Sequence, residues 1–390
     1  MNKSILKPEV QEFIRNFSGD LSKLAFSGSP FHDVTTRELL EQLKSRQKSK
    51  SKIPTWFKAE NIYYPPTLNM EQTSSEITAA YKSKLVLGKR MADITGGFGV
   101  DSFLFAQQFE HVDHFEVNPL ISEIAKHNLE QLGSKNVQFL ALDGIKGVTD
   151  RLYDLIYVDP SRRHDAKGKV FFLEDCLPNI PENLEFLMEQ TSTLLIKTSP
   201  MLDISIGIKA LKYVNEIHIV AVQNEVKEVL WLLKKPSAFE PMITTINFTN
   251  SVEEIFVFKY GSLGVPRYSG PKKYLYEPNA AILKSGGFSV ISEHFEMAKL
   301  GKHTHLYTSD ELIDFPGRRF RIKNKVAYNK KEMRDGITFD KANIAIRNFP
   351  ENVEALKKRW KFKDGGDHYV FFTTVGSNEK MMLLCEKITT

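Results

Sequence analysis

The sequence has little cysteine and no long apolar run. Its two cysteines, Cys176 and Cys385, are too few for the disulfide framework of a secreted domain or for a cysteine-ligated zinc site. No segment approaches the roughly 20 apolar residues of a membrane-spanning helix, and the first residues lack the apolar centre of a signal peptide. These absences predict a cytoplasmic protein that uses neither a membrane nor a metal ion.

Positive and negative charges are also balanced, except near the end of the chain. Residues 310–390 hold 17 Lys and Arg against 12 Asp and Glu, which accounts for the whole net charge of +5. Two clusters of basic residues beside aromatic ones lie in this region, at residues 318–325 and 357–363. A third basic cluster lies at residues 44–52. Such clusters suit a phosphate backbone with bases available for stacking, although any one of them fits a solvated face equally well. The candidates for RNA contact are Arg318, Arg319, Arg321, Lys323, Lys357, Lys358 and Arg359.

The most informative glycines follow Asp93. The run Ile-Thr-Gly-Gly-Phe-Gly-Val-Asp holds three glycines in four positions, at Gly96, Gly97 and Gly99. Glycine permits the positive φ angles and the close backbone approach of a tight turn. The residues after it predict a helix, whose first N–H groups are unpaired at the positive end of its dipole. A strand, turn and helix of this kind fit a nucleoside-containing ligand, as used by both dehydrogenases and methyltransferases.

Charged residues end the next expected strands. Glu116 lies in a strand over residues 112–117, Asp143 follows one over 136–141, and Asp159 ends one over 154–159. A fifth strand, over 193–197, ends in Lys197. An acid at 116 suits the two ribose hydroxyls of an adenosine, and one at 143 suits its adenine amino group. A dehydrogenase requires neither Asp143 nor an Asp-Pro-Ser-Arg exit, so this order resembles a class I S-adenosylmethionine-dependent methyltransferase.

The segment before the glycine turn reads as mostly helical. Residues 9–17 and 35–47 have the apolar spacing of helices, and the basic stretch at 44–52 is expected to fray or to link. Aromatic residues between 56 and 64 are expected to dock on a core. A Ser/Thr cap with a trailing Glu predicts a further helix over 77–85.

The segment after the fifth strand continues the expected sheet. A strand is predicted at 216–222, an apolar-striped helix at 224–233, and a hairpin of strands 242–248 and 253–260 that supplies an antiparallel edge. A Gly- and Pro-rich stretch at 261–271 marks a boundary. The domains are therefore predicted as residues 1–72, 73–262, 272–315 and 316–390.

Motifs along most of the chain resemble one family. They are Glu71-Gln-Thr-Ser-Ser-Glu, the glycine turn, Asp159-Pro-Ser-Arg-Arg, Ile196-Lys-Thr-Ser-Pro-Met-Leu-Asp, Tyr276-Glu-Pro-Asn-Ala-Ala, and Arg347-Asn-Phe-Pro with Gly-Gly-Asp-His-Tyr. The sequence is similar to bacterial class I methyltransferases that carry a THUMP-like C-terminal domain. The resemblance implies an α/β fold: a Rossmann-like, seven-stranded core at 73–262 after an N-terminal helical segment, then small ferredoxin-like and THUMP-like domains. True THUMP domains act in transfer RNA modification, so the implied partner is a structured RNA, of which transfer RNA is one candidate.

The resemblance also implies S-adenosylmethionine as the cofactor. Asp93, Thr95, Gly96, Gly97 and Gly99 would hold its methionine end, Glu116 its ribose and Asp143 its adenine. Ser74 and Ser75 would close over it. Both serines fit a helix cap equally well, and Asp143 also fits a turn before Gly144.

Residues Asp159, Pro160, Ser161 and Arg162 would face the methyl acceptor. Their position matches the Asn/Asp-Pro-Pro-aromatic motif of amino-group methyltransferases, in which the acid or amide and a proline carbonyl bind an exocyclic amine. Here Ser161 and Arg162 replace the second proline and the aromatic residue, and an arginine suits a phosphate instead. Arg163 fits a plain surface charge.

Three other activities stay open beside base amino-group methylation, which we favour slightly. Ribose 2′-hydroxyl methyltransferases use a Lys-Asp-Lys-Glu set, which Asp159, Lys197 and Glu225 match, with Lys82 or Lys84 as the first lysine. Carbon methylation through a cysteine is least favoured, because Cys176 lies 17 residues beyond Asp159. In a different class, the chain would be a catalytically silent RNA-binding protein on a methyltransferase scaffold.

Overall fold

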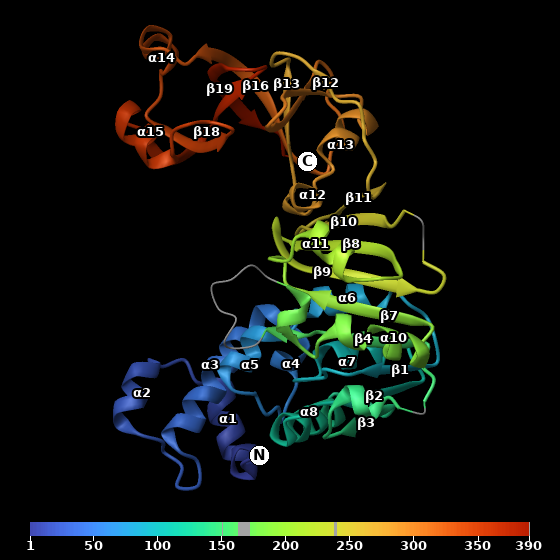
Figure 1. The fold of residues 1–390 in the computed structure, drawn as a ribbon. Helices are drawn as coiled ribbons and strands as arrows, with labels where there is room; N and C mark the ends of the chain where they lie inside the picture. The colour runs from blue at the N-terminus through green and yellow to red at the C-terminus, as the bar shows by residue number, and fades with distance from the viewer. Residues whose placement is uncertain (150, 163–171, 238–239, 390) are drawn as a thin grey trace. The chain divides into compact units, whose positions relative to one another are not determined.

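A computed structural model describes residues 1–149, 151–162, 172–237 and 240–389, with Arg162 described by its backbone alone. The chain divides into two units (Figure 1). The first unit comprises residues 1–215 and 230–238, and the second comprises residues 216–229 and 239–390. The helices of the described residues are all too short or too polar to span a bilayer.

Helices open the first unit, and they include the two that the apolar spacing predicted at 9–17 and 35–47. They are η1 (Lys3–Leu6), α1 (Pro8–Asn16), α2 (Leu21–Ser27), α3 (Thr36–Lys52), α4 (Pro54–Lys58) and α5 (Thr67–Gln72). The basic stretch at 44–52 does not fray, contrary to our expectation, because α3 continues to Lys52. Ser45 and Ser49, one helical turn apart, are buried, while the neighbouring Lys44, Lys48 and Lys50 are exposed.

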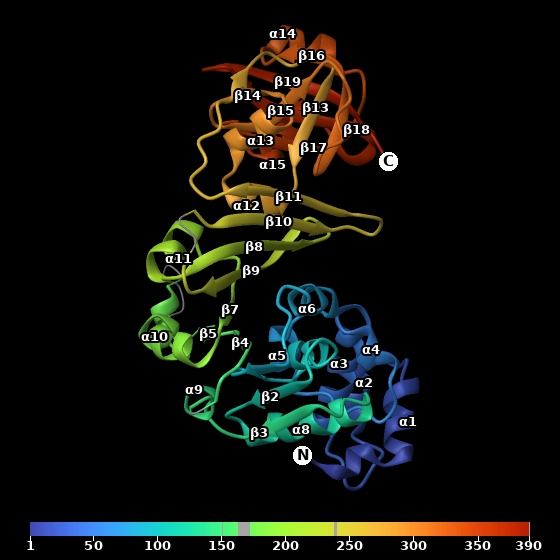
Figure 2. The ribbon, with the colours of Figure 1, turned by 90° about the vertical axis from the view of Figure 1, so that its right-hand side faces the viewer.

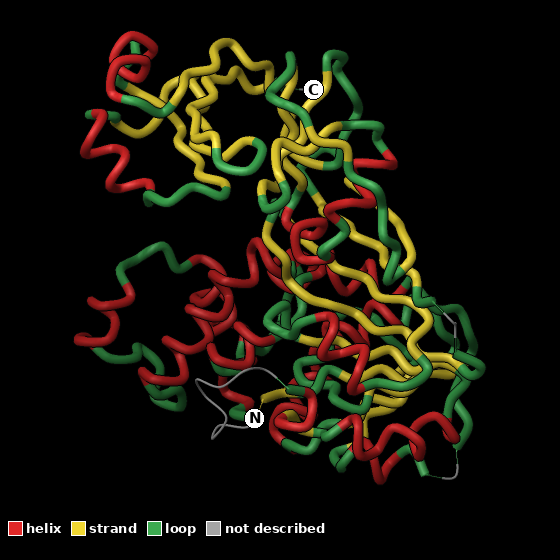
Figure 3. The backbone as a smooth tube through the Cα atoms, turned by 45° about the horizontal axis from the view of Figure 1, so that its top comes forward, coloured by secondary structure: helices red, strands yellow, loops and turns green. Residues whose placement is uncertain are grey.

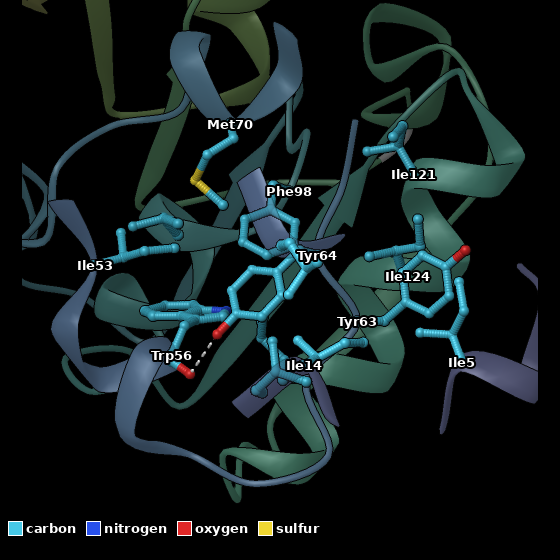
Figure 4. Close-up of a cluster of buried hydrophobic side chains, with 14 of the residues drawn as sticks. Ile5, Ile14, Ile53, Trp56, Tyr63, Tyr64, Met70, Phe98, Ile121 and Ile124 are labelled. Atoms are coloured by element: carbon cyan, nitrogen blue, oxygen red, sulfur yellow. Dashed lines mark hydrogen bonds between the residues drawn. The ribbon is translucent and has the colours of Figure 1, made fainter. Parts of the chain in front are cut away.

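The aromatic residues before the sheet dock on the core, as predicted. Trp56 and Tyr64 are buried in one cluster with Phe98, Ile121 and Ile124, which follow later in the chain (Figure 4). The Tyr64 hydroxyl donates a hydrogen bond to the Trp56 carbonyl at 3.2 Å. This cluster fixes the N-terminal helices to the glycine turn and to the helix that carries Ile121 and Ile124.

Parallel strands form the centre of the first unit. β1 (Arg90–Asp93) pairs with β2 (His111–Phe115) and β4 (Leu155–Val158), β2 pairs with β3 (Val137–Leu140), and β4 pairs with β7 (Thr193–Thr198). Parallel strands place all their carboxyl ends at one edge of the sheet. In Figure 2, α6 (Glu76–Ser83) and α8 (Pro119–Gln131) lie on one side of these strands, and α10 (Ile180–Gln190) and α11 (Ile204–Ala210) lie on the other. Shorter elements complete the unit: α7 (Val100–Phe105), α9 (Gly144–Gly147), β5 (Ser161–Arg162), η3 (Leu173–Asp175) and β6 (Cys176–Leu177).

The sheet has nine strands among the described residues, two more than expected, in the order β11-β10-β8-β9-β7-β4-β1-β2-β3. The segment predicted as a helix at 224–233 is strand β9 (Glu225–Lys234), so that prediction is wrong. It forms a hairpin with β8 (Val214–Val222), joined by Gln223 and Asn224, which both have positive φ angles. Residues 229–233 are buried on both faces of the sheet, and an apolar run of this length fits a buried strand as well as a helix. β10 (Met242–Phe248) and β11 (Glu253–Lys259) form the predicted antiparallel edge.

The second unit contains an eight-stranded sheet in the order β12-β14-β15-β13-β16-β19-β18-β17 among its described residues. Its strands are β12 (Arg267–Tyr268), β13 (Tyr274–Pro278), β14 (Ala298–Gly301), β15 (Thr304–Ser309), β16 (Gly317–Ala327), β17 (Lys341–Arg347), β18 (Lys363–Val375) and β19 (Glu379–Lys387). Its helices are α12 (Ala280–Ser285), α13 (Phe288–His294), α14 (Lys330–Gly336) and α15 (Val353–Trp360). Figure 3 shows α14 and α15 in red beside the yellow strands of this sheet.

Candidate functional site

The glycine turn has the geometry that its sequence predicted. β1 ends at Asp93, and Gly99 caps α7 with a φ of 87°. Gly97 also lies in the left-handed region, with a φ of 52°. A Cβ built on Gly96 would lie 2.2 Å from the imidazole of His114, so the backbone passes directly over that ring. The turn therefore requires glycine at 96 for space and favours it at 97 and 99 for backbone conformation.

Glu116, which follows β2, holds the turn in place. One of its carboxylate oxygens accepts a hydrogen bond from the Gly97 amide at 2.9 Å, and the other accepts one from the Asn118 amide at 2.7 Å. Each oxygen keeps a second lone pair, so the carboxylate can still accept hydrogen bonds from a ligand. A Cβ on Gly97 would meet nothing closer than the Thr95 carbonyl, 3.8 Å away, so this side of the turn is open.

Asp93 belongs to a buried polar chain beneath the turn. Its carboxylate accepts hydrogen bonds from the Ser102 hydroxyl at 2.6 Å and the Thr95 amide at 3.2 Å. Burial, with smaller contributions from the Asp101 and Asp159 charges, raises the pKa of Asp93 to about 7.

The same chain continues to His114. The Ser102 oxygen lies 2.9 Å from His114 Nδ1, and burial lowers the pKa of His114 to about 4, so the ring is neutral near pH 7. Since the single Ser102 proton goes to Asp93, we assign the imidazole proton to Nδ1, which donates to the Ser102 oxygen.

A buried lysine lies behind the turn. The Lys82 side chain on α6 is 0% exposed, and its Nζ is 3.0 Å from Asp101 Oδ1 on α7. Ser74 and Tyr157 each donate a hydrogen bond to Asp101 Oδ2, at 2.7 and 3.0 Å, and Lys82 donates to Ser74 at 2.9 Å. Burial opposes ionisation of Asp101, but the Lys82 and Lys197 charges outweigh it and hold the pKa of Asp101 below its usual value.

The two serines expected to close over a ligand have local partners. Ser74 is buried and belongs to the Lys82 and Asp101 network. Ser75 is the N-cap of α6, where its side chain accepts a hydrogen bond from the Thr78 amide at 3.3 Å. The cap that the sequence left as an alternative is therefore present at Ser75.

Asp159 and Lys197 meet at the carboxyl edge of the sheet. Lys197 Nζ donates to the Asp159 carboxylate in an ion pair, with the lysine side chain 12% and the aspartate side chain 33% exposed. The Asp159 amide donates to the Thr95 hydroxyl at 2.7 Å, which ties the end of β4 to the glycine turn. The acid is thus held by groups from two other strand ends.

The residues that follow Asp159 in the predicted acceptor motif lead into a short antiparallel strand pair. Pro160 is buried, Ser161 is exposed, and β5 pairs with β6 through Ser161–Leu177 and Arg162–Cys176. The Arg162 side chain and all of Arg163 lie outside the described residues.

Asp143 and Glu225 take surface positions. Asp143 caps α9 and accepts hydrogen bonds from the Ile145 and Lys146 amides at 2.9 and 3.4 Å, as the turn alternative predicted. A Cβ on Gly144 would lie 2.4 Å from the Ile94 carbonyl, so the loop that carries Asp143 packs against the glycine turn. Glu225 lies in the second unit, where its side chain is 75% exposed and pairs with Lys227 at 2.6 Å.

The predicted RNA-contacting residues in the second unit fall into three groups. Arg318 pairs with Glu277, whose side chain is only 3% exposed and which also pairs with Arg347, a residue that was not a predicted RNA contact. The other pairs are with acids that are exposed or, in the case of Glu351, partly buried: Arg319 with Asp314 at 3.1 Å, Lys323 with Glu386 at 2.7 Å, Lys357 with Asp364 at 2.6 Å and Arg359 with Glu351 at 2.8 Å. Arg321 and Lys358 are exposed.

Sequence reasoning missed the buried network of Asp101, Ser102, His114 and Tyr157, and named Lys82 only as a candidate base. One signal was present, because Asp101 and Ser102 are polar residues in the first turn of an otherwise apolar helix. Their partners come from other elements, so no local pattern identifies the pairs. Among the described residues, no group of three or more His, Cys, Asp or Glu side chains is placed to hold a metal ion.

Comparison with known proteins gives three family matches. Residues 38–164 match the model for protein-L-isoaspartate(D-aspartate) O-methyltransferase, residues 274–316 a ferredoxin-like domain, and residues 317–387 a THUMP domain-like model. No curated protein matches the chain significantly.

Among solved structures, a crystal structure of a candidate methyltransferase from Porphyromonas gingivalis W83 is 29% identical and covers 99% of both chains, with a TM-score of 0.88. An rRNA methylase from Streptococcus thermophilus and a candidate methyltransferase from Streptococcus mutans in complex with SAH are each 15% identical. They cover 41% of this chain and 94% and 96% of their own, and their TM-scores of 0.31 and 0.30 support no argument.

These matches confirm the family resemblance and the fold class expected from the sequence. The chain combines a mixed α/β sheet of methyltransferase-like fold with C-terminal ferredoxin-like and THUMP-like domains. The comparisons support a methyltransferase, and the THUMP-like domain suggests RNA binding.

Proposed function

We propose that this protein is an S-adenosylmethionine-dependent methyltransferase that acts on structured RNA. The observation that carries the proposal is the meeting of the glycine turn, Glu116 and Asp159 at one edge of the sheet. In open α/β sheets, ligands bind outside the carboxyl ends of the strands. This edge offers an open glycine turn, a carboxylate with spare lone pairs and an acid beside a lysine.

The residues at this edge fit the cofactor. The open side of Gly97 accommodates close approach of a ligand to the backbone. Glu116 accepts hydrogen bonds from the two ribose hydroxyls while its backbone contacts keep the carboxylate oriented. Asp143, on the loop against Ile94, accepts from the adenine amino group, and Asp93 lies beneath the methionine end. The bound cofactor supplies a methyl group already activated on a sulfonium.

The protein's part in such a transfer is proximity, orientation and exclusion of water. Asp159 accepts an N–H hydrogen bond from an exocyclic amine of the acceptor base, and the Pro160 carbonyl accepts another. Lys197 and the Asp159 amide contact with Thr95 fix that carboxylate relative to the turn. These contacts would orient the amine lone pair, and Asp159 would accept the N–H proton that methylation releases.

Ribose methylation is the second candidate, and the contact between Lys197 and Asp159 favours it. In that reaction Lys197 would pass a proton to Asp159 and then take the proton of the 2′-hydroxyl. The other two members of the set have different partners, since Lys82 pairs with Asp101 and Glu225 pairs with Lys227. Base amino-group methylation therefore stays slightly preferred.

Calorimetry with S-adenosylmethionine tests the cofactor, and nucleoside mass spectrometry of bulk RNA tests the activity. We expect measurable binding and the loss of one methylated nucleoside in cells from which the gene is deleted. Absence of binding at millimolar cofactor would instead favour a silent RNA-binding protein on this scaffold.

A further inference from the structure

A pocket with a volume of about 690 Å³ lies in the second unit, between α14 and the end of α15. This volume is in the range of small-molecule binding sites. The residues that matter for its chemistry are Tyr328, Lys330, Arg334, Arg359, Trp360 and Lys361. The pocket therefore joins two basic segments of the sequence, 330–334 and 359–361, into one concave surface.

The charge of this pocket is of one sign. None of its lining residues in the described part of the chain is acidic. Lys330, Arg334 and Lys361 are exposed, and none of the three forms an ion pair with another described residue. Arg359 pairs with Glu351 at 2.8 Å and donates to the Tyr328 hydroxyl at 3.1 Å. Three cations thus remain available to an anion in a concave site, where ligand charge is screened less than on an open surface.

Tyr328 and Trp360 form the aromatic wall of the pocket, and rings of the core beneath hold Tyr328 in place. The Tyr328 ring lies 4.9 Å from Phe349 and 5.8 Å from Phe372, both nearly perpendicular to it. Trp360 lies 6.2 Å from Tyr328 and is only partly buried. A wall of this kind is preformed, so a flat ring that packs against it does not have to order it first.

We propose that the pocket between α14 and α15 binds a phosphorylated nucleotide unit. The phosphate is recognised by Lys330, Arg334 and Lys361, and the base packs against Trp360. Fixed aromatic rings next to several cations are the combination that proteins use for single-stranded nucleic acid. An acidic peptide would use the cations but has no flat ring for the aromatic wall. That the nucleotide comes from an RNA strand rests on the function proposed above, whereas nucleotide binding itself does not.

Intrinsic fluorescence of the full chain gives a selective signal for this site. The chain has three tryptophans, and Trp56 and Trp231 are fully buried in the first unit, so Trp360 alone lines an accessible pocket. The probes are uridine 5′-monophosphate, uridine, an eight-residue single-stranded RNA and tetraglutamate. Uridine is chosen because it lacks the adenine that the first unit is proposed to bind.

We expect the RNA, the nucleotide or both to quench Trp360, and uridine to bind at least about tenfold more weakly than its monophosphate. Quenching by both probes indicates that the pocket accepts the unit from either source, and quenching by the RNA alone indicates a strand. Trp360→Phe should abolish the signal. The double variant Lys330→Glu with Arg334→Glu should weaken binding about tenfold or more and reduce its salt dependence. Lys302→Glu, an exposed charge reversal on the β14–β15 turn, is the matched control and should change nothing.

Three results would overturn the proposal: no quenching by either phosphorylated probe, equal quenching by uridine, or equal quenching by tetraglutamate. A filter-binding assay separates this failure from failure of the proposed function. If the full chain binds RNA but the double variant binds it equally well, the pocket assignment is wrong and RNA binding stands. If nucleotide quenches Trp360 but no RNA is bound, the pocket stands and the proposed RNA substrate fails.

Discussion

Lys82 Nζ lies 3.0 Å from Asp101 Oδ1, and the lysine side chain is entirely buried. This pair connects α6 to the first turn of α7, next to the glycine turn. Removing one partner of a buried pair leaves an uncompensated charge and typically costs about 3–5 kcal/mol.

Replacement of Lys82 by methionine should therefore lower the free energy of unfolding by about 3–5 kcal/mol. Asp101→Asn in the same background should recover part of this loss, because it removes the stranded charge. Urea unfolding of the two single variants and the double variant measures the coupling. Strictly additive losses would mean that the two side chains do not interact.

The pH dependence of the free energy of unfolding should reveal the titration of the buried Asp93 carboxyl group. Its pKa is raised to about 7 by burial, so between the usual aspartate pKa and pH 7 the folded state holds a proton that the unfolded state has released. The stabilisation is full at low pH and is lost as the pH rises to 7, which amounts to about 4 kcal/mol for about three pKa units.

The Asp93→Asn variant isolates this effect, because asparagine stays neutral at every pH. The difference in unfolding free energy between the wild type and the variant should fall by about 4 kcal/mol from pH 4 to pH 7. The depressed pKa of His114, about 4, acts in the opposite direction over pH 4 to 6.5, and it is common to both proteins. A difference that does not vary with pH would show that Asp93 is ionised throughout.

Gly96 should tolerate no side chain. Gly96→Ala places a methyl group 2.2 Å from the His114 imidazole, so we expect a loss of about 1–3 kcal/mol from overpacking. Gly97→Ala is the control within the same turn, since its Cβ points into open space and only its φ of 52° is unfavourable. Thermal unfolding of both should rank the first variant clearly below the second.

Single substitutions test each proposed cofactor contact separately. Glu116→Gln should weaken S-adenosylmethionine binding about tenfold, because hydrogen bonds to a charged acceptor are the stronger kind. Asp93→Ala should also weaken it. Asp143→Ser keeps a good helix cap, so a loss of affinity without a loss of stability would assign Asp143 to the adenine. Calorimetry measures each value, and unchanged affinity in all three would remove the glycine turn from the cofactor site.

The exposed cations of the second unit should carry the RNA contact. Arg321→Glu with Lys358→Glu is expected to weaken RNA binding at 0.1 M salt and to lower the slope of log affinity against log salt by about 1–2. Arg318→Glu should act differently, because Arg318 neutralises the buried Glu277, and it should lower stability first. An unaltered salt slope in the double variant would place the RNA elsewhere.

Local sequence patterns predicted most of the secondary structure of the first unit. The glycine turn, the capped helix at Ser75, the strand that ends at Asp93 and the strands directly before Glu116 and Asp159 were all predictable, because each depends on residues close together in sequence. The hairpin at β9 was not, since the apolar run 229–233 fits two structures and its turn, Gln223-Asn224, lacks glycine.

The functional groups were predictable only where they follow strands. Asp159 and Thr95 lie at carboxyl ends of parallel strands, so topology brings them together. The pair of Lys82 and Asp101 depends on how two helices pack, which no spacing within either helix reveals. For the same reason the pocket between α14 and α15 was visible only as two separate basic segments.

The buried Glu277 links the two C-terminal segments that match different family models. This carboxylate lies on β13, and its two counterions come from β16 and β17, beyond the point where one family match ends and the next begins. A chain that ended after the ferredoxin-like segment would leave the Glu277 carboxylate buried without a counterion. We therefore expect the segments 274–316 and 317–387 of this chain to fold as one unit.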